Sequence, residues 1–79
     1  MGTVSRAADM LSSQMMRYGM SQTQLARDTG LSRTYINDIL RGRTPVSARA
    51  ALAFELLLGV SAHALLTEQN KDNLEKARR

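Results

Sequence analysis

The chain has 79 residues and a formal net charge of +4, with one histidine and no cysteine. This length predicts a single domain over residues 1–79, and the lack of cysteine excludes disulfides and thiolate metal sites. The basic charge indicates nucleic acid or an anionic membrane surface as a partner, although ordinary solubility charge would also account for it.

The first half of the sequence predicts two helices. The first four residues are expected to form a loose terminus, and apolar residues then recur at helical spacing from Ser5 onward. This first helix is predicted to end at Tyr18, because Gly19 suits the position after a helix terminus. A second helix begins after Ser21, which opens a capping box, and it ends at Gly30.

Three further helices are predicted in the second half. The residues expected to cap their starts are Ser32, Ser47 and Ser61. The third helix runs to about Arg41, and Gly59 ends the fourth. The polar residues 68–79 form a C-terminal tail that either continues the fifth helix or frays. Since no strand pattern occurs, the sequence predicts an all-α fold of five helices.

Residues 22–41 have the layout of a helix-turn-helix. Ala26 falls where the two helices would cross, and a bulky side chain there would push them apart. Gly30 supplies the positive φ of a tight turn. Ile36 and Ile39 are placed to anchor the second helix of the pair against the first. A plain helical hairpin is the alternative interpretation of this pattern.

The third predicted helix carries a polar face opposite its apolar one. The polar positions span about 140° of a helical wheel. In a helix-turn-helix the N-terminal part of the second helix enters the major groove, where arginine, threonine, asparagine and aspartate can contact base edges. The predicted base-reading residues are Arg33, Thr34, Asn37 and Asp38. Asp38 could instead repel a wrong base or pair with a neighbouring arginine, and a solvated face is the alternative for the whole set.

Other polar residues around the motif are predicted to contact DNA phosphates. Backbone N–H groups at the start of a helix can hold a phosphate at the positive end of the helix dipole, and two arginines follow the recognition helix. The predicted phosphate contacts are Ser21, Gln22, Ser32, Tyr35, Arg41 and Arg43. Arg27 and Arg49 are weaker candidates of the same kind, whereas Arg6 and Arg17 are expected to be solvated.

The segment Met20–Arg43 resembles the Xre/Cro family of phage-repressor-like helix-turn-helix proteins. This resemblance implies a lambda-repressor-like domain of five helices. The sequence that follows resembles HigA-type antitoxins most clearly at Gly59, Ser61, Gln69, Leu74, Ala77 and Arg78. That resemblance implies a small cytoplasmic dimer that represses its own operon and binds a small toxin protein. The string SRTYINDI also resembles restriction–modification controller proteins, so that function and a stand-alone phage-type repressor remain alternatives.

Operator recognition leads us to expect two copies of the chain. One recognition helix contacts only about four or five base pairs, too few to select a site in a genome. A twofold homodimer would bind two half-sites of a palindromic double-stranded operator, about 34 Å apart. The predicted interface residues are Phe54, Leu57, Leu58, Leu65 and Leu66. The sequence does not divide them between core and interface, and a monomer that buries all of them is the alternative.

Catalysis and membrane insertion are not expected. The sequence has no paired carboxylates in a cleft pattern, no Ser/His/Asp set and no phosphate loop, and His63 alone cannot form a zinc site. We therefore expect no enzyme activity, no cofactor and no metal. No stretch approaches the roughly 18 apolar residues of a membrane span, and the first residues lack the apolar core of a signal peptide. A cytoplasmic location is expected.

Overall fold

The computed structural model describes residues 5–78, apart from the side chain of Lys76, and this range contains five helices. They are α1 (Arg6–Tyr18), α2 (Gln22–Thr29), α3 (Arg33–Leu40), α4 (Ala48–Leu58) and α5 (Ala62–Ala77). No strand forms within the described range, so the predicted all-α class is confirmed. None of these helices is both long and apolar enough to cross a membrane. The predicted loose terminus, residues 1–4, lies outside the described residues.

Serine side chains start all five helices. In each case the serine Oγ accepts a hydrogen bond from the backbone N–H three residues ahead, at 3.0–3.2 Å. These residues are Ser5, Ser21, Ser32, Ser47 and Ser61. Each such cap satisfies a backbone donor that the helix itself leaves unpaired and contributes about 1 kcal/mol. Between α2 and α3, Gly30 adopts φ 76°, which confirms the positive φ predicted for this turn.

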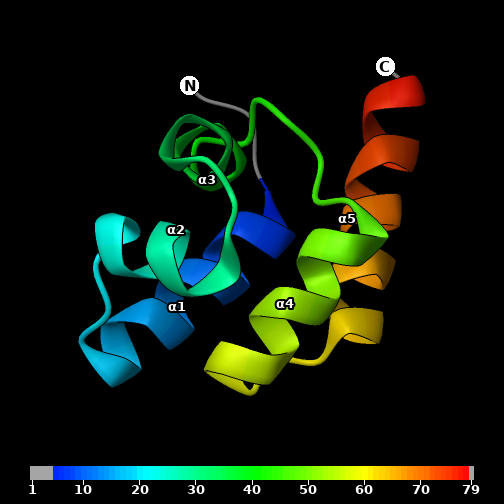
Figure 1. Ribbon diagram of the computed structural model, residues 1–79. Coiled ribbons are helices and arrows are strands. Elements are labelled where there is room, and N and C mark those ends of the chain that lie inside the picture. The colour runs from blue at the N-terminus through cyan, green and yellow to red at the C-terminus, as the bar shows by residue number, and fades with distance from the viewer. Residues whose placement is uncertain (1–4, 79) are drawn as a thin grey trace.

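The five helices enclose one core (Figure 1). In Figure 1, α4 and α5 lie side by side on the right, and the α2–α3 pair lies on the left. Helix α1 contacts α3, α4 and α5, and it therefore joins the two halves. Leu11, Phe54 and Leu65 lie at the centre and expose 1% of their surface or less. The contacts of α3 with α1 and of α2 with α4 position the α2–α3 pair on the rest of the fold.

Three of the five residues predicted for a dimer interface are buried in the hydrophobic core. Phe54, Leu58 and Leu65 each expose 0% of their surface and belong to the hydrophobic core cluster. A second chain cannot reach them in this fold, so they leave the predicted interface and belong to the core. Leu57 and Leu66 are only partly buried and remain at the surface.

The polar C-terminal residues continue α5 to Ala77, and their side chains contact the first residue of α1. The Arg6 Nη1 donates to Asp72 Oδ1 at 3.0 Å, and the Arg6 backbone N–H donates to Asp72 Oδ2 at 2.9 Å. A further hydrogen bond, from Arg6 Nη2 to Glu75, raises the pKa of the guanidinium. The expectation that Arg6 is merely solvated is wrong, since its side chain ties α1 to α5.

Candidate nucleic-acid interface

Helix α3 is anchored through one face, as the wheel predicted. Ile36 and Ile39 expose 1% and 2% of their surface, and Leu25 of α2 exposes 1%. Ala26, where the two helices meet, is partly buried against the same core. Because the apolar side of α3 is fully occupied, its opposite side is the one left to meet a ligand.

A shallow depression on that opposite side is lined by Gln22, Arg33, Thr34 and Asn37. Arg33 and Thr34 are exposed, whereas Asn37 and Gln22 are half-buried. The Asn37 Nδ2 donates a hydrogen bond to Gln22 Oε1 at 3.2 Å, which joins α3 to the first residue of α2. The structure thus brings three predicted base-reading residues together with one residue that was predicted to contact phosphate.

Asp38 lies outside this depression and is half-buried. Its backbone carbonyl accepts a hydrogen bond from the Arg43 N–H at 2.9 Å, which closes the turn after α3. None of the salt bridges within residues 5–78 includes its carboxylate. Pairing with an arginine of the same chain, one of the alternatives for this residue, therefore does not occur among the described residues.

Three exposed arginines surround α3, namely Arg33, Arg41 and Arg43. Among the described residues, salt bridges form only through Arg6 and Lys71. The three guanidinium groups around α3 consequently have no carboxylate partner in this range and can approach an anion without breaking an ion pair.

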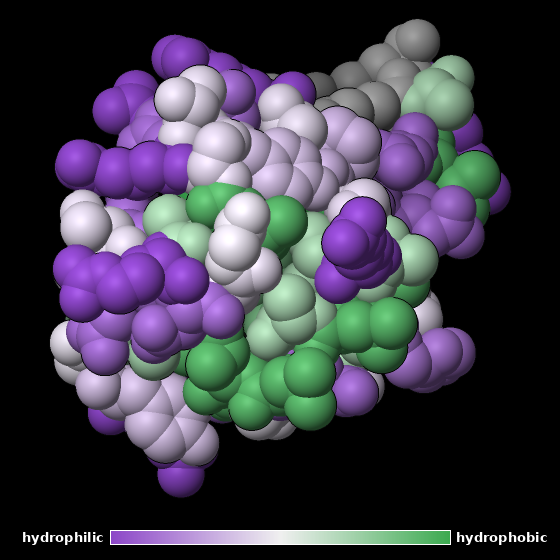
Figure 2. Space-filling model, viewed as in Figure 1, coloured by the Kyte–Doolittle hydropathy of each residue, from purple (hydrophilic) through white to green (hydrophobic). Residues whose placement is uncertain are grey.

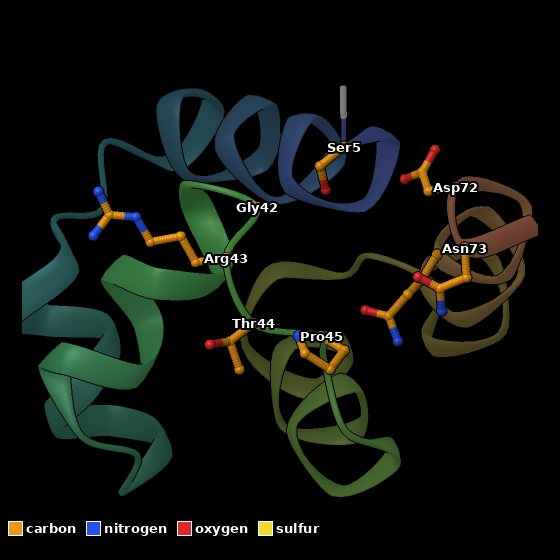
Figure 3. A pocket seen from close by; sticks show the side chains of 8 residues that line it. Ser5, Gly42, Arg43, Thr44, Pro45, Asp72 and Asn73 are labelled. Atoms are coloured by element: carbon orange, nitrogen blue, oxygen red, sulfur yellow. The ribbon is translucent and has the colours of Figure 1, made fainter. Parts of the chain in front are cut away.

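Arg43 follows α3 and borders a pocket between the start of α1, the α3–α4 loop and α5. Figure 3 shows its side chain extending away from Asp72 and Asn73, which lie on the far side of the pocket. The Gln69 side chain holds the same loop, since its amide exchanges two hydrogen bonds with the Val46 backbone. The loop that carries Arg43 is therefore fixed to α5.

Tyr35 has partners inside the chain. Its hydroxyl accepts a hydrogen bond from the Ser47 N–H at 3.2 Å and lies 3.4 Å from Pro45 O and from Ser47 Oγ. These contacts join α3 to the N-cap of α4 and to the loop before it. A phosphate contact by Tyr35 stays a prediction, as do those of the exposed helix caps Ser21 and Ser32.

An apolar patch that the sequence analysis missed covers the outward side of α4 (Figure 2). Leu52 is 56% exposed and Leu56 is 86% exposed. The two residues are four positions apart, so they share one helix face, and we refer to them as the α4 stripe. A helical wheel places them opposite Phe54 and Leu58, but the wheel alone does not say which side faces inward.

Comparison with known families resolves the alternatives for the α2–α3 pair. A family model described as helix-turn-helix matches residues 11–65, which reach from α1 into α5. The chain belongs to the Xre-type helix-turn-helix family. Its fold is the five-helix, lambda-repressor-like domain implied by the sequence resemblance, and α2 and α3 form the DNA-binding motif.

Solved structures agree with this assignment. The chain superimposes on antitoxin GraA with a TM-score of 0.83 and 29% identity, over 98% of this chain and 83% of that one. It superimposes on an addiction module antidote protein of a HigA family from Coxiella burnetii with a TM-score of 0.80 and 21% identity, over 98% of this chain and 84% of that one. A search of curated proteins found no significant sequence match.

Proposed function

We propose that this chain is a sequence-specific regulator that binds a double-stranded operator, represses its own operon and acts as the antitoxin of a toxin–antitoxin module. The observation that carries the proposal is the depression lined by Arg33, Thr34 and Asn37 on the outward side of α3. The antitoxin part is supported by the similarity to GraA and to the Coxiella antidote protein, together with the resemblance of the C-terminal half to HigA-type antitoxins.

In this proposal α3 lies in the major groove with its N-terminal turn deepest. Arg33 there can donate two hydrogen bonds to guanine O6 and N7, Thr34 can contact a thymine methyl, and Asn37 can pair with adenine N6 and N7. Arg41 and Arg43 then meet phosphates beside the groove, where they position α3 but carry no sequence information. Asp38 is assigned to the rim of the same surface, where a cytosine N4 would be its partner.

We propose that the chain acts as a homodimer and that a second copy covers the α4 stripe. A twofold arrangement of antiparallel α4 helices would place Leu52 of one copy against Leu56 of the other. Leu57 and Leu66 are partly buried and remain in the proposed interface. The need to contact two operator half-sites supports a second copy as the occupant.

The DNA-binding part is tested by footprinting the purified chain on the DNA upstream of its own gene. We expect protection of one palindrome whose half-sites are about one helical turn apart. A shuffled duplex of equal length is the control, and equal binding to both duplexes would overturn the proposal of a sequence-specific regulator.

The antitoxin part is tested separately, by expressing the neighbouring gene with and without this chain. We expect growth arrest by the neighbour alone, relief by the chain and co-purification of the two proteins. A neighbouring methyltransferase and endonuclease pair would instead identify a restriction–modification controller. That result would overturn the antitoxin assignment while leaving operator binding intact.

A further inference from the structure

We infer that Gln22 helps to specify the operator sequence, acting with Asn37 as one hydrogen-bonded pair, and is not only a phosphate contact. This inference rests on the proposed operator binding and deepens it. The first observation is the position of Gln22. It is the first residue of α2, yet it lines the same depression as Arg33 and Thr34 of α3.

The hydrogen bond between the two amides fixes both side chains. The Asn37 Nδ2 donates to Gln22 Oε1 at 3.2 Å, although the residues are fifteen positions apart in the chain. Both residues are half-buried, whereas their neighbours Arg33 and Thr34 are exposed. The pair therefore forms the less exposed part of the lining of the depression, and the hydrogen bond restrains the rotation of both amides before DNA binds.

The remaining donors and acceptors define which base edge the pair can recognise. An asparagine amide has two N–H donors and one carbonyl acceptor, so after this bond Asn37 keeps one donor and its Oδ1. Those are the two atoms that adenine N7 and N6 require. Gln22 uses its oxygen toward Asn37 and keeps both Nε2 hydrogens, which can donate to thymine O4 or guanine O6. The pair can therefore recognise an adenine through Asn37 and a neighbouring thymine or guanine through Gln22.

This role differs from a phosphate contact in what the protein distinguishes. A phosphate contact contributes equally on every sequence. A member of a base-recognising pair contributes only where the correct base pair is present, and its removal also frees Asn37 to rotate. Replacing Gln22 should therefore weaken discrimination at the base pair that Asn37 contacts.

The test measures dissociation constants by fluorescence anisotropy for wild type, Gln22→Ala, Asn37→Ala and the double variant. Each protein is titrated with the operator and with duplexes changed at one base pair of each half-site. We expect Gln22→Ala to reduce the discrimination between the operator and one single-base-pair variant about tenfold. The affected base pair should be the one at which Asn37→Ala also reduces discrimination. The double variant should lose no more there than Asn37→Ala alone, since the two amides act together.

Gln24→Ala is the matched control, because Gln24 is an exposed glutamine of the same helix that does not line the depression. It should leave the base preferences unchanged. Gln22→Met keeps the length of the side chain without its hydrogen-bonding atoms, and it should reproduce Gln22→Ala if the fold is intact by circular dichroism. A uniform loss on all duplexes, no loss at all, or additive losses in the double variant would each overturn the inference. Wild-type protein that binds operator and shuffled DNA equally would instead overturn the proposed function.

Discussion

Substitution of Leu56 by glutamate should dissociate the proposed homodimer without unfolding the chain. Leu56 is 86% exposed in the single chain, and complete burial of a leucine contributes about 1.5–3 kcal/mol. Covering this exposed fraction on both copies would thus contribute about 2.6–5 kcal/mol to association. At 1.4 kcal/mol per factor of ten, its loss should raise the dimer dissociation constant roughly one hundred to several thousand times.

Sedimentation at several protein concentrations measures this shift, and a thermal melt at a concentration where both proteins are monomeric separates it from folding. The monomer melt should be almost unchanged, since the side chain faces water and such substitutions shift stability by about 0.5 kcal/mol or less. Met16→Glu is the matched control because Met16 is 82% exposed on α1. An unchanged dimer for Leu56→Glu, or dissociation caused by Met16→Glu instead, would refute the assignment of the interface to α4.

Three other outcomes follow from the same structure. Ile36→Ala should destabilise the chain by about 2–5 kcal/mol, because Ile36 is 1% exposed beneath the recognition surface. The melting temperature should then fall by about 10 °C or more, whereas Thr34→Ala on the exposed side of α3 should leave it unchanged. Arg43→Ala should weaken binding to all duplexes equally, and a loss confined to one base pair would contradict its role as a phosphate contact. If a dimer neutralises about eight phosphates, log K plotted against log salt should have a slope of about −7, and a slope near zero would contradict a phosphate-dominated interface.

The helix boundaries were largely predictable because they depend on neighbouring residues. Serine before a helix and glycine after one act within a single turn of the chain, and the positive φ of Gly30 follows from the local geometry of the turn. The two faces of α3 were predictable for a related reason, since Ile36, Ile39 and Leu40 fall on one side of the helix and its polar residues fall on the other. Local spacing was sufficient in both cases.

The surface of α4 was not predictable in this way. This helix carries apolar residues on every side, so its sequence does not reveal which side the rest of the chain will cover. Contacts from α1, α2 and α5 bury Phe54 and Leu58 and leave Leu52 and Leu56 outside. Only tertiary packing determines that division.

Two polar contacts escaped the sequence analysis because their partners are distant in the chain. Arg6 and Asp72 lie near opposite ends of the sequence, yet they are hydrogen-bonded in the fold. The amides of Gln22 and Asn37 meet across the helix-turn-helix, whose geometry sets their separation. No local pattern marks either pair, since each depends on how two helices lie against each other.

The contact of Arg33 with a base edge is the central claim, and its most direct test is the ratio of dissociation constants for the operator and for single-base-pair variants, measured with wild type and Arg33→Ala. We expect Arg33→Ala to lose about 1–3 kcal/mol of discrimination at one base pair and to keep the other preferences. Arg78→Ala removes an equal charge from an exposed position after α5 and should leave every ratio unchanged. If Arg33→Ala retains the wild-type affinity and all of the wild-type ratios, α3 does not recognise the operator in the way described.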